Sequence, residues 1–252
     1  MDRLYRRPLW NLPVFAGALA IAALASGAGA LAQTTASVPA NPARIVEMRH
    51  HFVDISLVQE SVIRGDLASV RAPARRLMQL ATPVDMPPAS APFITTIRVA
   101  ARRAAEAQTL RASALAATTM LEQCGGCHQA VTVRPVPTSA SRPDVGGLVG
   151  HMLEHQRAAD QLLQGIVIPS ATAWSQGVQA LRIAPLKASE FPPDSRFRSD
   201  FHKAETEVHD IANDARADDA MAQRVDTYAR LLTTCASCHS LHRRIWGPGT
   251  GQ

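Results

Sequence analysis

Two copies of the motif Cys-x-x-Cys-His constrain this chain more than any other feature. The first copy, CGGCH, spans residues 124–128 and the second, CASCH, spans residues 235–239. On a helix, positions i and i+3 share a face and i+4 lies close by, so the two sulfurs and the imidazole can reach one group. This is the spacing of c-type haem attachment, in which both sulfurs form thioethers and the histidine binds iron.

The motifs therefore predict two covalently bound haem c groups. The expected thioether residues are Cys124, Cys127, Cys235 and Cys238, and the expected proximal iron ligands are His128 and His239.

Three other uses of paired cysteines are weaker explanations. A four-cysteine zinc site leaves the histidine after each pair unexplained. A thioredoxin-like redox pair needs a βαβ setting, and the sequence shows no strand pattern. Structural disulfides suit an exported protein, but a bond within C-x-x-C closes only a short loop. The two motifs use all 4 cysteines of the chain, which favours haem attachment.

The motifs close two copies of a longer repeat. Met48-x-x-His51 begins the first copy and Met152-x-x-His155 the second, an offset of 152 − 48 = 104, whereas the cysteine motifs are 235 − 124 = 111 apart. An insertion of about seven residues in the proline-rich loop of the second copy accounts for the difference.

Apolar periodicity and breakers predict four helices in each copy. The expected helices are 43–63, 67–81, 92–107 and 109–128 in the first copy, and 148–167, 171–183, 200–216 and 218–242 in the second. We therefore expect an all-α protein of two tandem four-helix bundles, over residues 33–132 and 148–252. A Pro-, Ser- and Gly-rich linker over residues 133–147 joins them.

The N-terminus has the pattern of an export signal. Arg3, Arg6 and Arg7 precede an apolar stretch from Val14 to Ala25, and residues 30–32, Ala-Leu-Ala, resemble a cleavage site before Gln33. Residues 1–32 are thus expected to be a cleaved signal peptide that directs the chain to the periplasm. An uncleaved membrane anchor is the alternative, although the apolar stretch is short for a span. No other segment is expected to cross a membrane.

The start of the first helix and the end of the fourth lie at the same end of an up-down-up-down bundle. Met48 and His51 should then lie near the first haem, and Met152 and His155 near the second. We favour His51 and His155 as distal ligands, with Met48 and Met152 as alternatives and an open iron as a third possibility. The other histidines without a repeat partner are expected to be exposed or capping: His50, His151, His202, His209 and His242.

A four-helix unit with C-x-x-C-H near the end of its last helix resembles the cytochrome c′-like four-helix-bundle cytochromes. The resemblance covers most of each unit in layout, and its specific motif is the haem site alone. It implies haem c with electron transfer or, in some members, binding of small gases. The chain departs from the family in its duplicated unit and in the M-x-x-H pattern at the start of each copy.

Composition agrees with a haem protein but excludes little else. Aromatic residues make up only 4% of the chain, so a buried porphyrin would supply apolar mass to an alanine-rich core. The net charge of +5 falls to +3 without residues 1–32, and interspersed acidic residues argue against nucleic-acid binding. We expect a dihaem electron carrier that meets redox partner proteins. The alternatives are a dihaem peroxidase-like enzyme and a gas-binding or sensing protein.

Overall fold

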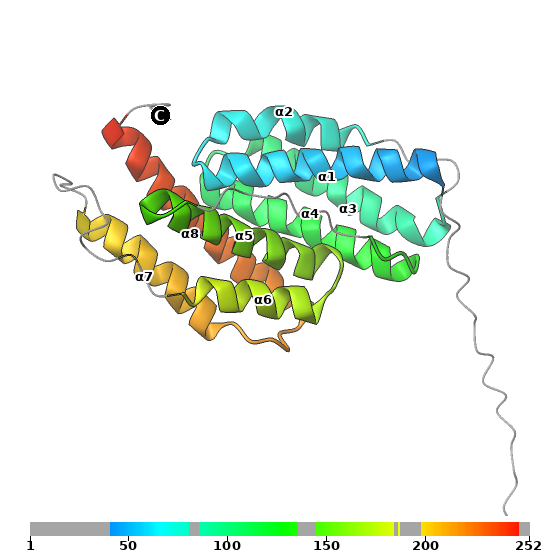
Figure 1. The fold of residues 1–252 in the computed structure, drawn as a ribbon. Helices are drawn as coiled ribbons and strands as arrows, with labels where there is room; N and C mark the ends of the chain where they lie inside the picture. Colours follow the sequence, from blue (N-terminus) through cyan, green and yellow to red (C-terminus); the bar gives the residue numbers. More distant parts are fainter. Residues whose placement is uncertain (1–40, 81–85, 136–144, 184–185, 187–197, 247–252) are drawn as a thin grey trace, which may run out of the picture. The chain divides into compact units, whose positions relative to one another are not determined.

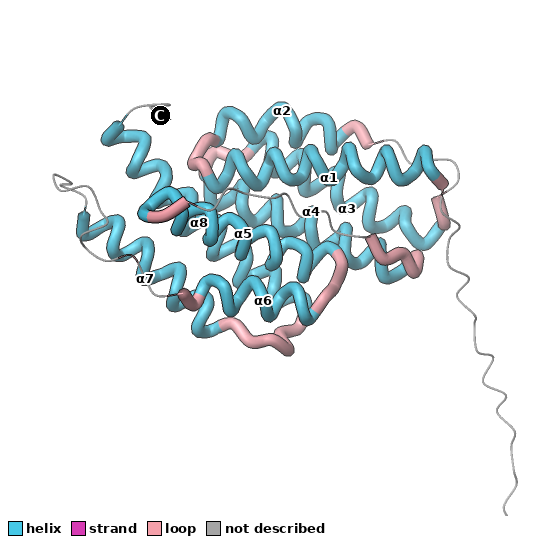
Figure 2. The backbone as a smooth tube through the Cα atoms, viewed as in Figure 1, coloured by secondary structure: helices cyan, strands magenta, loops and turns pink. Residues whose placement is uncertain are grey.

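The structure, a computed structural model, is all-helical over the residues it describes, which are 41–80, 86–135, 145–183, 186 and 198–246. This confirms the expected all-α class, and Figures 1 and 2 show the helices in order along the chain. The helices are α1 (Pro42–Ile63), α2 (Leu67–Met78), the short 3-10 helix η1 (Pro88–Ser90), α3 (Ala91–Glu106), α4 (Leu110–Ala130), α5 (Gly147–Val167), α6 (Ala171–Leu181), α7 (Arg198–Asp214) and α8 (Met221–Trp246). The eight expected helices agree with these α-helices to within four residues at each end.

Side-chain caps explain where several of these helices begin. The side chain of Asn41 accepts a hydrogen bond from the backbone N–H of Ala43, and Pro42 provides a favourable first residue of α1. Asp66 and Ser170 cap α2 and α6 in the same way, at positions 104 residues apart. Gly65, with φ of 68°, ends the turn after α1 in the left-handed conformation that glycine adopts readily.

The helices of each repeat copy pack on one another in succession, and the two copies also pack together. α1 contacts α2, α2 contacts α3 and α3 contacts α4, while α5, α6, α7 and α8 follow the same pattern. α4 lies against α8 and α5, and α1 lies against α8, so helices from both copies share one hydrophobic core. The halves of the repeat are therefore in direct contact.

Buried positions fall in equivalent registers in the two copies. The buried residues of α2 are Val70, Pro73, Ala74 and Leu77, and those of α6 are Trp174, Gly177, Val178 and Leu181, each 104 positions later. The same comparison of α3 with α7 gives an offset of 111, for example from Ile97 to Val208. The offset changes between α6 and α7, where the sequence repeat places its insertion.

No helix in the described part of the chain has the length and apolar character that a membrane span requires. Residues 1–32 and the central part of the expected linker, 136–144, lie outside the described residues.

Trp174 should contribute strongly to the stability of the second copy. Its side chain is fully buried, its Nε1–H donates to the carbonyl of Arg216 at 2.9 Å, and its backbone lies against Gly165 of α5. We expect Trp174→Ala to lower the free energy of unfolding by about 3–5 kcal/mol, because it opens a cavity and leaves the Arg216 carbonyl without this donor. Denaturant unfolding measures the change.

Val149→Ala is the control, because Val149 is 65% exposed and its loss should change stability by no more than about 0.5 kcal/mol. Equal effects of the two substitutions would contradict the packing described for Trp174.

Candidate functional site

The two C-x-x-C-H motifs lie near the C-terminal ends of α4 and α8, and their cysteines are thiols without a disulfide. Burial raises the pKa of Cys124 and Cys235 to about 12 and that of Cys238 to about 11, and it also raises the pKa of Cys127. These groups are therefore protonated at neutral pH and lack the thiolate character of redox-active cysteines. Among the described residues, the cysteines also do not belong to a cluster with the proximity of metal ligands.

The histidine of each motif hydrogen-bonds to the other copy of the repeat. His128 on α4 bonds through Nδ1 to the carbonyl of Val167, the last residue of α5, at 2.9 Å. His239 on α8 bonds through Nδ1 to the carbonyl of Ile63, the last residue of α1, at 2.6 Å. Val167 lies 104 positions after Ile63, so the two bonds are equivalent in the repeat.

These bonds fix the tautomer of both histidines. A carbonyl oxygen only accepts, so Nδ1 of each ring carries the proton and the lone pair of the neutral ring lies on Nε2. Burial lowers the pKa of His128 and so favours the neutral ring, although the hydrogen bond to Val167 raises this pKa. A neutral imidazole that donates through one nitrogen to a backbone carbonyl has the usual state of a histidine metal ligand.

Small residues allow the helices to approach closely at both crossings. A Cβ at Gly125, between the cysteines of the first motif, would lie 2.3 Å from the carbonyl oxygen of Ile166. At the equivalent crossing, a Cβ at Gly65 would lie 2.3 Å from Oγ of Ser240 and 3.0 Å from the carbonyl oxygen of Ala236. The close contact places the end of each first helix within reach of the motif histidine.

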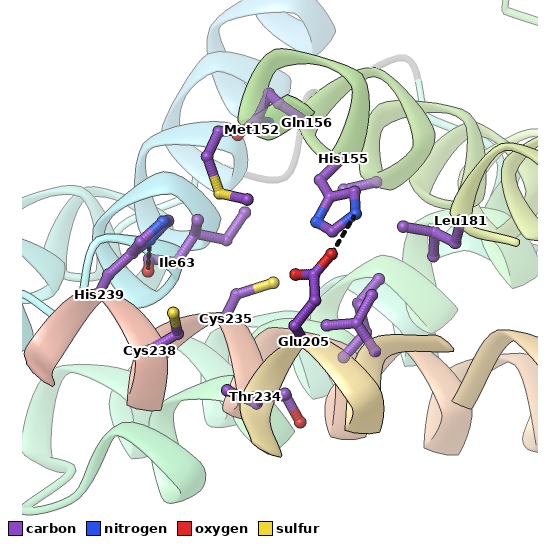
Figure 3. Close-up of a pocket in the computed structure, with 14 residues that line it drawn as sticks. Ile63, Met152, His155, Gln156, Leu181, Glu205, Thr234, Cys235, Cys238 and His239 are labelled. Atoms are coloured by element: carbon purple, nitrogen blue, oxygen red, sulfur yellow. Dashed lines mark hydrogen bonds and ion pairs between the residues drawn. The ribbon is translucent and has the colours of Figure 1, made fainter. Parts of the chain in front are cut away.

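The second motif lines a pocket, shown in Figure 3, with an empty volume of about 550 Å³ that includes some open solvent. Cys235, Cys238 and His239 lie on one side, and Met152 and His155 extend from α5 on the other. The structure thus brings together the residues of the second motif and both distal candidates of the second copy. The remaining lining residues are mostly apolar and include Ile63, Ala159, Leu181, Val208 and Leu231.

In the first copy, the distal candidates lie at equivalent positions on α1. Met48 and His51 are half-buried, and His51 Nε2 lies 3.9 Å from a carboxylate oxygen of Glu47, one turn earlier. Burial lowers the pKa of His51, although Glu47 and Asp54 oppose the shift. Phe93 at the start of α3 packs against Gly126 of the first motif.

One cluster, of which His155 and Glu205 line the second pocket, was not expected from the sequence. Nε2 of His151 and Nε2 of His209 lie 2.6 Å and 3.2 Å from the same oxygen of Glu205, and His155 Nε2 lies 3.9 Å from it. The expectation that His151 and His209 are exposed or capping is wrong, because their side chains are only 11% and 10% exposed. His50 and His202 are exposed as expected.

The cluster holds one negative charge among three imidazoles. Burial alone would raise the pKa of Glu205, but the hydrogen bond from His151 and the neighbouring His155 lower it to about 2. Burial lowers the pKa of His155 to about 4, against the attraction of Glu205. At neutral pH the cluster therefore contains an ionised Glu205 and a neutral His155.

Comparisons with protein-family models, curated proteins and solved structures find no match to this chain.

Gly125→Ala should disturb the crossing between the first motif and α5. The new methyl group would meet the backbone of Ile166, so the end of α5 must move away from His128. We expect a loss of about 1–3 kcal/mol of unfolding free energy and a change in the imidazole nitrogen NMR shifts of His128, which report its bond to Val167.

The matched control is Gly146→Ala, where a Cβ meets no atom within 4 Å. It should cost less than about 1 kcal/mol, an effect of the α5 N-cap position alone, and leave the His128 shifts unchanged. A Gly125→Ala protein with unaltered stability and shifts would refute this close crossing.

Proposed function

We propose that this chain is an exported dihaem c-type cytochrome that transfers electrons between redox partner proteins. Each repeat copy would form a four-helix bundle that holds one haem c near the end of its last helix, so that two bundles follow in tandem. The cysteine pairs 124/127 and 235/238 would form the thioethers, and His128 and His239 would bind the irons.

The observation that carries the proposal is the state of the two motif histidines. Each donates Nδ1–H to a helix-end carbonyl, at 2.9 Å for His128 and 2.6 Å for His239. The lone pair of the neutral ring then lies on Nε2. A structural disulfide pair or a redox-active thiol pair would not require this arrangement of the following residue. An axial iron ligand does, because the second-shell bond fixes its tautomer and raises its basicity.

The donor set around the second motif also suits a haem. Two protonated thiols three residues apart, the imidazole of His239 and a largely apolar pocket meet at one site. His155 and Met152 face this pocket from α5 and are the candidates for the sixth ligand. Methionine opposite histidine would give a higher reduction potential than a second histidine.

A bound haem would supply the one-electron chemistry, and the protein would set its surroundings. The helices would hold the axial donors, and the second pocket is lined mainly by apolar side chains. Burial and axial ligation are the features by which a protein adjusts a haem potential. Attachment of haem c and the signal-like residues 1–32 both favour a periplasmic location.

A dihaem peroxidase-like or gas-binding protein is the second candidate, favoured by the difference between the two sites. Glu205 and His209 correspond in the repeat to Ile94 and Arg98, so only the second copy carries an acidic group and an imidazole at these two positions. Two unequal haem sites suit an enzyme in which one iron is open, whereas two six-coordinate sites suit an electron carrier.

Mass spectrometry of the mature chain tests attachment and export together. We expect a polypeptide that begins at Gln33 and carries two haem groups that resist acid–acetone extraction, with no free thiol after denaturation and reduction. Replacement of both Cys124 and Cys127 with Ser should remove one haem, and replacement of both Cys235 and Cys238 should remove the other. A mature chain with four free thiols and no haem would disprove the proposal.

Optical spectra of the ferric and ferrous protein distinguish the two candidate functions. An electron carrier should give low-spin signals from both haems and no change on addition of CO. A high-spin fraction that binds CO would instead favour the enzyme or gas-binding alternative. The same spectra of Met48→Leu and His51→Ala proteins would identify the sixth ligand of the first haem, because only its loss makes that haem high-spin.

A further inference from the structure

We propose that His151, His155, Glu205 and His209 form a second kind of metal site, which binds one divalent transition-metal ion apart from any haem. The two pairs lie on different helices, His151 and His155 on α5 and Glu205 and His209 on α7. Each pair is separated by four residues, so both of its members lie on the same helix face.

The four donor atoms already lie close enough to surround an ion. One ligand atom of each residue lies within 4.8 Å of the others, whereas the ligands of a tetrahedral Zn²⁺ ion with bonds of about 2.0–2.1 Å are roughly 3.3 Å apart. Three imidazole nitrogens converge on a single carboxylate oxygen of Glu205, at 2.6, 3.2 and 3.9 Å. Small side-chain rotations would close this set around a cation.

A second observation also calls for a ligand. Nε2 of His155 is buried and has no hydrogen-bond partner, and the His155 side chain is only 12% exposed. An unsatisfied buried polar atom is costly, and coordination of a metal ion would satisfy it. The ion would also balance the buried charge of Glu205, whose side chain is 7% exposed.

The donor types indicate which ion fits. Three imidazoles and one carboxylate match the nitrogen and oxygen ligands of Zn²⁺, and imidazole-rich sites disfavour Mg²⁺ and Ca²⁺. Four protein ligands would complete a tetrahedral site, so its role would be structural. The ion would tie α5 to α7, and α7 otherwise packs mainly on α6 and α8.

The site would exist once in the chain, despite the repeat. The positions equivalent to His151, Glu205 and His209 are Glu47, Ile94 and Arg98. Of the four positions, only that of His155 has the same residue in the first copy, His51. With His155 bound to this ion, Met152 would remain as the distal donor of the second pocket. In Figure 3, Met152 extends into the pocket on the side of His239, whereas His155 points toward Glu205.

Zinc binding by the purified full-length mature protein tests the site. After treatment with a chelator, isothermal titration and elemental analysis should give one tightly bound Zn²⁺ per chain. Glu205→Gln and His209→Ala should each weaken binding by more than about 100-fold, since loss of a second-shell partner alone costs about 10–100-fold. His202→Ala is the matched control, because His202 is exposed on the same helix and its loss should leave the affinity unchanged.

His155→Ala is the deciding variant. We expect it to weaken Zn²⁺ binding while both haems keep the spin state of the parent protein. A chain that binds no Zn²⁺, or binds it equally well without Glu205 or His209, would overturn the site. So would a His155→Ala protein whose second haem becomes high-spin while its Zn²⁺ affinity is unchanged.

Haem content, measured in each sample, separates this proposal from the proposed function. If the chain lacked haem but its alkylated form still bound one Zn²⁺ through these residues, the metal site would stand and the cytochrome proposal would fall.

Discussion

The hydrogen bonds from His128 and His239 to the ends of α5 and α1 join the two copies of the repeat. The last carbonyls of a helix have no partner within that helix, and here a partly buried imidazole satisfies one of them in each copy. The same bond sets the tautomer of the histidine and requires the close helix crossings at Gly125 and Gly65. Local helix termination and the chemistry of the motif therefore depend on one contact.

Much of the helical framework could be predicted from the sequence because its signals are local. Asp66 and Ser170 mark helix starts through bonds to backbone N–H groups three residues later, and such caps are recognisable without a structure. The meeting of Met152 and His155 with the second motif also followed from simple antiparallel geometry. The last helix was less well bounded: it was expected at 218–242, and α8 spans Met221–Trp246.

The parts that the sequence did not reveal depend on contacts between distant helices. His151 and Glu205 are 54 residues apart, and nothing in the spacing of either pair shows that α5 and α7 face each other with these side chains inward. Two pairs with i, i+4 spacing, H-x-x-x-H and E-x-x-x-H, are the available signal, but neither pair recurs at the equivalent positions of the first copy. The crossing of each motif histidine to the opposite copy was also hidden, because its acceptor is a backbone group.

The two hydrogen bonds between the copies can form only in a fixed order during synthesis of the chain. The acceptor of His128 lies 39 residues downstream, so a chain that emerges from its N-terminus presents the first motif before Val167 exists to receive its bond. The acceptor of His239 lies 176 residues upstream, so it has already been synthesised when the second motif appears. The bond of His128 can thus form only after α5 has been synthesised, whereas the bond of His239 can form as soon as α8 appears.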